Sequence, residues 1–337
     1  MDALPVDAVI EELLVGFNEL NPMHVEELEE DPSPLEFMRS VARNTPFVIR
    51  RGASSWKAVR NWDAAYLKAA LSGQSVKVAV TPTGNADAPT YSRKHDAVLL
   101  AKPLEEDRPF DQFLEFIQGG KDIPPNQSSN EVWYAQTQND NLRDEYADLY
   151  ADVEKDIAFA RIALQRPPDA INLWIGNEKS VTAMHKDPME NIYVQVRGRK
   201  HFTLLPPICH PCTNENMIAT ATYRREANGE LSLETDEAGE AVPLATWDPD
   251  EPHSNATRFS HLVKPQKVTL EPGDMLYLPA MWYHKVAQSC IPGGEGFVLA
   301  VNYWYDMDFS GPLYPLTTFV RNIGLSLRND REQTGTT

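Results

Sequence analysis

The sequence has few cysteines and no long apolar run, and these absences restrict where the protein could work. Its three cysteines, Cys209, Cys212 and Cys290, are too few and too odd in number to form a disulfide framework. No stretch of about eighteen apolar residues occurs, so no transmembrane helix is expected. No charged-then-apolar leader opens the chain. Together these features predict a reducing, cytoplasmic location, with the nucleus as a second compartment, and no membrane partner.

Positive charge is also scarce. The 337 residues include 49 Asp and Glu against 31 Lys and Arg, which leaves a formal net charge of −18. The basic runs are no longer than Arg50-Arg51 and Arg197 to Lys200. Because this charge repels nucleic acids and anionic membranes, we expect neither as a partner. A basic protein or a cationic side chain fits better as the substrate.

Several catalytic motifs are missing. There is no Gly-x-Ser-x-Gly elbow and no Gly-x-x-x-x-Gly-Lys-Ser/Thr loop, so the sequence does not support an α/β hydrolase or phosphate chemistry. There is no His-Glu-x-x-His pair of the kind found in zinc peptidases. Cys209 and Cys212 have the spacing of half a zinc site, but no second pair follows. We therefore interpret them as ordinary loop cysteines.

Hydrophobic periodicity divides the chain into a mixed first part and a strand-rich second part. In residues 1–130 it predicts helices at 5–20, 34–43, 62–71 and 110–117 and strands at 47–50 and 76–80. From residue 131 the pattern changes to short strands between turns, at 132–137, 170–176, 191–197, 200–205, 267–271, 274–278 and 297–304.

We expect residues 131–310 to form one sandwich or barrel, because many short strands with turns between them are typical of these folds. The polar, acidic segment 226–262 is predicted to be a surface insertion in it. Residues 1–130 should pack on this core. A helix is expected at 311–329 and a flexible tail at 330–337.

The informative residues for chemistry are His185 and Asp187. In an extended strand their side chains project to the same face, so they can bind one metal ion together. His284, which follows a turn and an apolar strand, supplies a third ligand. Two His and one carboxylate are the facial triad of non-haem iron(II) enzymes. A single His-x-Asp is more often a surface hydrogen-bonding pair, so the surroundings must support the metal interpretation.

Lys200 supplies that support. It lies fifteen positions after His185, beyond a strand and the Arg197-Gly198 turn. A hairpin of this length should bring its ammonium back beside the metal face, where it could pair with the carboxylate of a cosubstrate.

Several runs of sequence resemble the jumonji C (cupin-like) 2-oxoglutarate oxygenases. They are Asn172 to Gly176, Val181 to Tyr193, Gly198 to Phe202, Gly273 to His284 and Ala300 to Met307. The resemblance covers roughly residues 5 to 325. It implies a mainly β fold with flanking α elements: a double-stranded β-helix, or jelly-roll, with N-terminal and C-terminal helices.

The resemblance also implies a reaction. The family uses iron(II), 2-oxoglutarate as cosubstrate and dioxygen, and its most similar members carry out (3S)-hydroxylation of a lysine in a developmentally regulated GTP-binding protein. His185, Asp187 and His284 match the metal ligands, and in a crystal manganese, nickel or zinc could replace the iron. The resemblance further favours a homodimer in which terminal helices take part. The alternative is a C-terminal helix that simply covers the barrel.

Other positions match residues that bind 2-oxoglutarate in the family. Lys200 matches the residue that pairs with the distal carboxylate, and Thr182 and Tyr134 match hydrogen-bond donors to that group. Asn191 and Asn302 match amides near the metal-binding end of the cosubstrate. Candidates for substrate contact, three of them acids that could receive a lysine ammonium, are Glu190, Tyr193, Trp282, Asp306 and Asp308.

Three other activities are alternatives. Histone lysine demethylases belong to the same class, but they commonly have Glu where Asp187 stands. A metal-dependent endopeptidase acting on histone tails has also been claimed for relatives. A non-catalytic cupin-like binding protein is disfavoured, because the ligands and Lys200 all appear intact.

Overall fold

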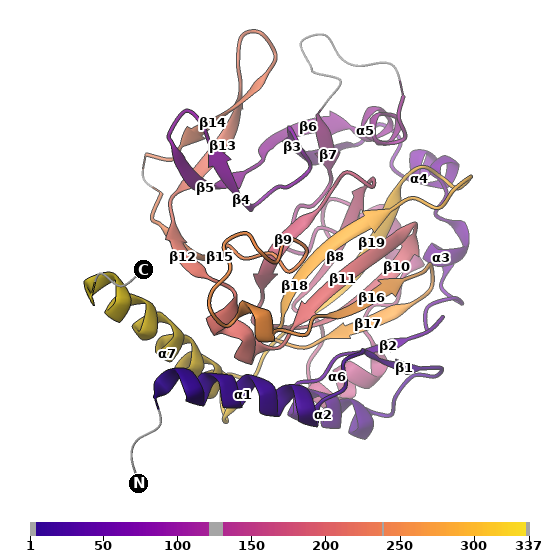
Figure 1. The fold of residues 1–337 in the computed structure, drawn as a ribbon. Coiled ribbons are helices and arrows are strands. Elements are labelled where there is room, and N and C mark those ends of the chain that lie inside the picture. The colour runs from indigo at the N-terminus through magenta and orange to yellow at the C-terminus, as the bar shows by residue number, and fades with distance from the viewer. Residues whose placement is uncertain (1–4, 121–130, 238, 335–337) are drawn as a thin grey trace.

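Two β-sheets that face each other form the centre of the molecule. The computed structural model describes residues 5–120, 131–237 and 239–334. The larger sheet has, in spatial order, β1 (Glu26–Leu28), β2 (Phe47–Ile49), β17 (Met275–Leu278), β10 (Met189–Arg197), β19 (Val298–Asp306) and β8 (Ala170–Gly176). The smaller sheet has β16 (Gln266–Leu270), β11 (Arg199–Leu205), β18 (Tyr283–Ser289) and β9 (Thr182–Lys186). The predicted jelly-roll with flanking helices is confirmed (Figure 1).

The turn between β10 and β11 takes the chain from one sheet to the other. Gly198 occupies it with a φ of 64°, a left-handed conformation that side chains other than glycine rarely adopt. A Cβ atom at this position would lie 2.7 Å from Val298 Cγ2. This turn, which the sequence predicts, leads directly to Lys200 on the smaller sheet.

The helices lie outside the sheets. They are α1 (Val6–Leu20), α2 (Pro34–Arg43), α3 (Lys57–Asn61), α4 (Ala64–Ala70), α5 (Phe110–Ile117), α6 (Ala158–Leu164) and α7 (Leu313–Thr334), with short 3₁₀ turns η1 (Ala147–Asp152), η2 (Pro207–Cys212) and η3 (Ser260–Leu262). The start of α2 shows why its bounds agree with the prediction. Ser33 and Glu36 form a reciprocal capping box with Pro34 at the first turn, and Asn44 ends the helix in the left-handed conformation.

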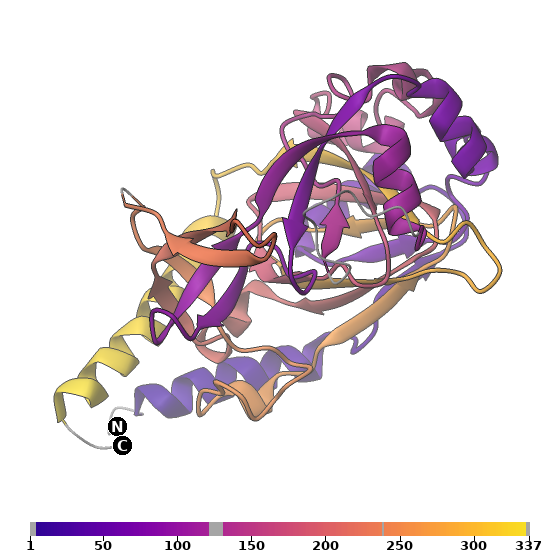
Figure 2. The same ribbon diagram turned by 90° about the horizontal axis from the view of Figure 1, so that it is seen from above.

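Further strands form an arm beside the mouth of the barrel (Figures 1 and 2). One of its sheets has β14 (Leu231–Thr235), β13 (Thr220–Arg225), β5 (Ala97–Lys102) and β4 (Ala88–Ser92), and another has β6 (Leu104–Pro109), β3 (Ser75–Thr81) and β7 (Val132–Tyr134). A pair, β12 (Glu215–Ile218) and β15 (Val242–Ala245), joins the arm to the barrel. Within the segment 226–262, β14 extends a sheet to which residues from the first 130 also contribute, and β15 pairs with β12.

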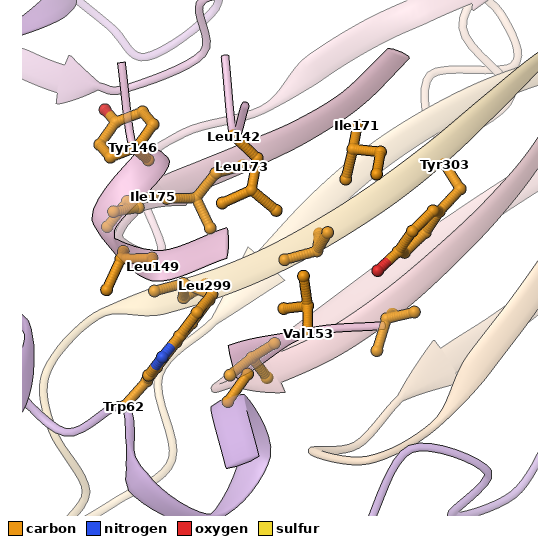
Figure 3. Close-up of a cluster of buried hydrophobic side chains, with 14 of the residues drawn as sticks. Trp62, Leu142, Tyr146, Leu149, Val153, Ile171, Leu173, Ile175, Leu299 and Tyr303 are labelled. Atoms are coloured by element: carbon orange, nitrogen blue, oxygen red, sulfur yellow. The ribbon is translucent and has the colours of Figure 1, made fainter. Parts of the chain in front are cut away.

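The main hydrophobic core lies between the larger sheet and the helices. Figure 3 shows part of it, where Trp62 and Leu149 lie beside Leu299, in one cluster with Leu173 and Tyr303. A second cluster fills the space between the two sheets, with Leu276 from the larger and Phe202 from the smaller. Both sides of the larger sheet are therefore buried.

The ends of the chain differ in detail from expectation. α7 continues to Thr334, so most of the predicted tail from residue 330 is helical, and residues 335–337 lie outside the described residues. β4, β5 and β6 were not predicted: Pro89 interrupts β4 and charged residues fill β6, whereas β5 is an apolar run that was not recognised as a strand. None of the described helices combines the length and the apolar sequence that a membrane span needs.

Candidate metal and cosubstrate site

His185, Asp187 and His284 meet at one end of the smaller sheet. His185 on β9 and His284 on β18 are directly opposite each other in the antiparallel pair, and their ring centroids are 4.1 Å apart. Asp187 follows β9, and its Oδ2 lies 3.6 Å from Nε2 of each imidazole. The three possible ligand atoms all lie within 4.8 Å of one another. This spacing suits three ligands on one face of a single ion.

Backbone carbonyls orient both imidazoles. Nδ1 of His185 lies 2.8 Å from the Ala183 carbonyl oxygen, and Nδ1 of His284 lies 3.1 Å from that of Trp282. In the tautomer with hydrogen on Nδ1, each ring donates to its carbonyl and keeps the Nε2 lone pair for a metal. The two nitrogens and the carboxylate therefore form the donor set that iron(II) uses in facial triads.

The charges at this site suit a cation. Burial raises the pKa of Asp187, but its hydrogen bond and attraction to His185, and its attraction to His284, outweigh this and lower that pKa to about 2. Burial and the neighbouring His185 lower the pKa of His284 to about 4. The pKa of His185 is raised: burial would lower it, but Asp187 and, more weakly, Asp87 outweigh burial. At neutral pH the site thus offers an ionised carboxylate and a neutral His284.

Lys200 lies on the same sheet and is almost completely buried, with 2% of it exposed. Its Nζ donates hydrogen bonds to the Tyr134 hydroxyl and to Gln288 Oε1, each at 3.1 Å. Within the described residues no carboxylate pairs with this ammonium, and burial lowers its pKa to about 7. A buried cation with neutral partners is costly unless an anion joins it, so Lys200 fits the carboxylate of a bound ligand.

Gly176 makes room for this arrangement. A Cβ at position 176 would lie 2.6 Å from Tyr134 Cδ2 and 2.9 Å from Gln288 Nε2. Gln288 is also held by donation from its Nε2 to the Asn177 carbonyl oxygen at 2.7 Å. Gln288 was not predicted from the sequence. It lies four positions after His284 on β18, and this spacing places both side chains on the same face of the strand.

Asn191 and Asn302 are joined across the larger sheet. Asn302 Nδ2 donates to Asn191 Oδ1 at 3.0 Å, and the Trp174 indole donates to Asn302 Oδ1 at 2.8 Å. All three side chains are buried and line the cavity described next. The chain of hydrogen bonds fixes the orientation of both amides.

A cavity of about 240 Å³ opens over the metal face. Its lining includes most of the predicted residues, namely Thr182, His185, Asn191, Tyr193, His284 and Asn302. It also includes Asp87, Gln136 and Gln138 from the arm, which the sequence analysis missed. These three lie on or beside short strands far from the jumonji C motifs in the chain, so local spacing carried no signal for them.

The remaining predicted substrate residues do not reach this cavity. Glu190 is buried on the opposite side of the larger sheet, where its carboxylate accepts from the Tyr277 hydroxyl at 2.6 Å and the Ala280 amide at 3.2 Å. The Trp282 indole donates to Asn44 at 2.8 Å and is part of the core. Asp306 and Asp308 are exposed; Asp306 lies 3.8 Å from Arg166, and Asp308 accepts from the Ser310 amide. None of these four lines the cavity among the described residues.

The cysteines form no metal site in the part of the chain that the structure describes. Cys209 and Cys212 are buried in η2, and the Cys212 thiol donates to the Phe259 carbonyl oxygen at 3.4 Å. There, the group of His, Cys, Asp and Glu side chains close enough to share an ion consists of His185, Asp187 and His284.

Comparison with known proteins agrees with this geometry. A model of the cupin-like domain family matches residues 32–311. The chain is 36% identical over 291 residues to the bifunctional peptidase and (3S)-lysyl hydroxylase JMJD7 of Homo sapiens, with 86% of each chain covered. It is 37% identical over 296 residues to the lysine-specific demethylase JMJ32 of Arabidopsis thaliana, covering 85% of this chain and 82% of the relative. A third relative, JmjC domain-containing protein E of Dictyostelium discoideum, is 32% identical over 297 residues, with 83% of each chain covered.

Proposed function

The chain belongs to the cupin-like JmjC family of 2-oxoglutarate oxygenases, and from this premise we propose that it is a protein lysyl hydroxylase. The observation that carries the proposal is a His-Asp-His metal face together with a buried Lys200 that, in the part of the chain that the structure describes, has no carboxylate partner. A dicarboxylate such as 2-oxoglutarate could bind the metal with one end and pair with Lys200 through the carboxylate at its other end. The choice of lysine as the target rests on the similarity to JMJD7 and on the net charge of −18, which attracts a cationic segment.

The residues have distinct tasks in this reaction. His185, Asp187 and His284 would hold the iron, while Lys200 and Tyr134 would hold the distal carboxylate of 2-oxoglutarate. When bound, iron supplies the chemistry that activates dioxygen. One oxygen atom enters the target C–H bond as a hydroxyl group, and the other enters succinate as 2-oxoglutarate loses carbon dioxide. The chain's own contribution is to fix these groups in one orientation and to keep bulk water away.

We propose (3S)-lysyl hydroxylation of a developmentally regulated GTP-binding protein as the specific reaction. To test the class, the purified protein is incubated with a cell extract, iron(II) and 2-oxoglutarate, and modified peptides are mapped by mass spectrometry. A hydroxylase adds one oxygen atom to lysine and forms one succinate per event. Asp187→Ala, treated in the same way, is the matched control for modifications that arise without the metal site.

Demethylation is the second candidate, because the demethylase JMJ32 is as similar in sequence as JMJD7. The same experiment separates the activities. A demethylase removes methyl groups from lysine and releases formaldehyde, and a peptidase leaves cut peptides without succinate. Either pattern in the wild-type protein, absent from Asp187→Ala, would replace the hydroxylase proposal.

We also propose that the protein is a homodimer through its terminal helices. On α7 the partly buried Ile323 and Leu327 pack against the cluster that includes the η2 cysteines, but Leu316 and Phe319 are 59% and 60% exposed. An exposed apolar stripe of this kind favours a protein contact. Light scattering should report twice 37.9 kDa at micromolar concentration, and Phe319→Glu should give the single-chain mass. A 38 kDa particle for the wild type would show that α7 only covers the barrel.

A further inference from the structure

The cavity over the metal face has one carboxylate in its lining besides the metal-binding groups. Among the described residues that line it, Asp87 is this acid, and the others are apolar, amide, hydroxyl or imidazole side chains. Asp87 precedes β4, at the end of the β3–β4 loop. Its side chain is exposed enough for a ligand to reach, although the burial it does have raises the pKa of its carboxyl above the ordinary value.

The loop that carries Asp87 is fastened to the strand that carries the metal ligands. The Val181 amide, just before β9, donates to the Gly84 carbonyl oxygen at 2.8 Å. Gly84 has a φ of 84°, and a Cβ there would lie 1.9 Å from the Lys179 carbonyl oxygen. This contact therefore requires glycine, and it sets the distance between the loop and His185.

Asp87 itself is held in one conformation. Its φ of 55° is in the left-handed region, which Asp and Asn tolerate better than most residues. Its amide donates to the Ala101 carbonyl oxygen at 2.9 Å, and Gln136 Nε2 donates to its Oδ2 at 3.1 Å. Among the described residues no donor reaches the other carboxylate oxygen, Oδ1, so it can accept from a ligand. Asp87 and His185 line the same inner cavity.

Asp87 also connects the inner cavity to a larger outer one. The outer cavity, of about 560 Å³, shares Asp87, Gln136 and Gln138 with the inner one. Its other acid, Glu105, does not line the inner cavity, and it lies 3.7 Å from Lys77. A side chain that reaches from the outer cavity into the inner one would come close to Asp87, because Asp87 lines both.

We propose that Asp87 is the residue that receives the ammonium group of the substrate side chain, with Gln136 positioning its carboxylate. This rests on the proposed function, since it assumes a lysine substrate. Glu190, Asp306 and Asp308, which the sequence suggested for this task, are turned away from the cavity or lie outside it. In this assignment Asp87, in the arm, recognises the substrate, whereas residues of the two central sheets bind the metal and the cosubstrate.

The test measures peptide binding in a complex that does not turn over. The probes are a lysine peptide that the wild-type protein hydroxylates in the extract experiment and the same peptide with norleucine in place of that lysine. Binding is measured by calorimetry with 2-oxoglutarate and Mn(II) in place of iron. Asp87→Asn is the informative variant, because Asn keeps the left-handed backbone and can still accept from Gln136. Glu105→Gln is the matched control for a lost acid in the outer cavity.

We expect the wild type to bind the lysine peptide roughly tenfold or more tightly than the norleucine peptide, as charged hydrogen bonds are worth about 1.5–3 kcal/mol. In Asp87→Asn this preference should fall to within about twofold, while Glu105→Gln should keep it. The Kd of 2-oxoglutarate should not change in Asp87→Asn, which shows that the site is still folded.

Two results would overturn the inference, and they are distinguishable. If Asp87→Asn keeps the full preference for lysine over norleucine, the assignment of Asp87 is wrong and the proposed function stands. If the wild type hydroxylates an uncharged residue in the extract, the proposed function is wrong, and the assignment of Asp87 to an ammonium group falls with it.

Discussion

Both faces of the larger sheet are buried, but their residues have different roles. Along β10, Asn191 and Tyr193 face the cavity, while Ile192 and Val194 face the helices. The side facing the helices is apolar except for a few paired polar groups, and the side facing the smaller sheet carries the amides and the tyrosine of the site. Side chains alternate between the two faces of a strand, and usually one face contacts solvent and the other the core. In this sheet one face carries the residues of the site and the other carries the residues of the hydrophobic core.

Asp187 and Glu190 show the consequence for two acids of one motif. Asp187 directly follows β9 on the metal face, where the imidazoles lower its pKa. Glu190, three positions later, lies on the helix side of β10, where burial raises its pKa although Tyr277 and Ala280 donate to it. Both residues are acids and both belong to the same short motif. The face on which each side chain lies therefore decides its role. The following predictions test this division.

The largest effect is expected on the cavity side. Asp187→Ala should lower turnover at least about a thousandfold, equivalent to about 4 kcal/mol in the barrier, because the ion loses its anionic ligand. The thermal unfolding midpoint of the metal-free protein should stay near that of the wild type, since Asp187 is not part of the hydrophobic core. Succinate production and calorimetry measure the two quantities. Loss of folding together with loss of activity would contradict the separation.

On the helix side, Leu173→Ala should cost stability instead. Leu173 is completely buried on β8, and removal of such a side chain typically lowers the free energy of unfolding by about 2–5 kcal/mol. Urea unfolding measures the change. The KM for 2-oxoglutarate, assayed well below the midpoint of unfolding, should remain within twofold of the wild type. A large rise in this KM would show that the two sides of the sheet are coupled.

The third prediction concerns the cosubstrate. Lys200→Ala should raise the KM for 2-oxoglutarate roughly 10- to 100-fold, because a charged hydrogen bond is lost, and should weaken metal binding much less. Lys285→Ala is the matched control: it removes a lysine from the neighbouring strand whose ammonium pairs with Asp248 at 2.6 Å. Equal losses of metal and cosubstrate binding in Lys200→Ala would contradict the role assigned to it.

The fourth prediction is a pH dependence of cosubstrate binding. Burial lowers the pKa of Lys200 from 10.5 to about 7 in the folded protein without cosubstrate. The contribution of Lys200 to the free energy of unfolding is therefore full above pH 10.5 and is lost as the pH falls through 7. A bound carboxylate requires the protonated form, so binding takes up a proton above pH 7. The Kd should therefore rise by up to about tenfold per pH unit above 7. Calorimetry in two buffers of different ionisation enthalpy detects the proton, and Lys200→Arg should abolish the slope.

The smallest effect is expected for Glu190→Gln. Because the pKa of Glu190 is raised, its contribution to stability is full below the ordinary value of 4.5 and is lost as pH rises through the folded-state value. The stability of the variant relative to the wild type should therefore improve as pH rises from 4.5 to neutral. Urea unfolding at pH 4.5 and at neutral pH measures the change. A raised KM for a peptide substrate would instead return Glu190 to the substrate site.

Much of the fold follows from local patterns in the chain. The Ser33 and Glu36 capping signal set the start of α2, and alternation set β8 and β10 within about two residues. The jumonji C motifs led to the jelly-roll and to the cluster of His185, Asp187 and His284. These features depend on neighbours a few positions apart or on short motifs, and both are visible in a single sequence.

Other features depend on contacts that no spacing in the chain specifies. β13 pairs in parallel with β5, more than a hundred residues earlier, and this pairing builds the arm that brings Asp87 to the cavity. Likewise, Gln288 reaches Lys200 because Gly176 leaves space on a third strand. The side of the sheet on which Glu190 lies follows from the register of β10 between β17 and β19. A one-residue shift in that register would exchange its two faces, so the role of each polar residue was decided when the sheets assembled.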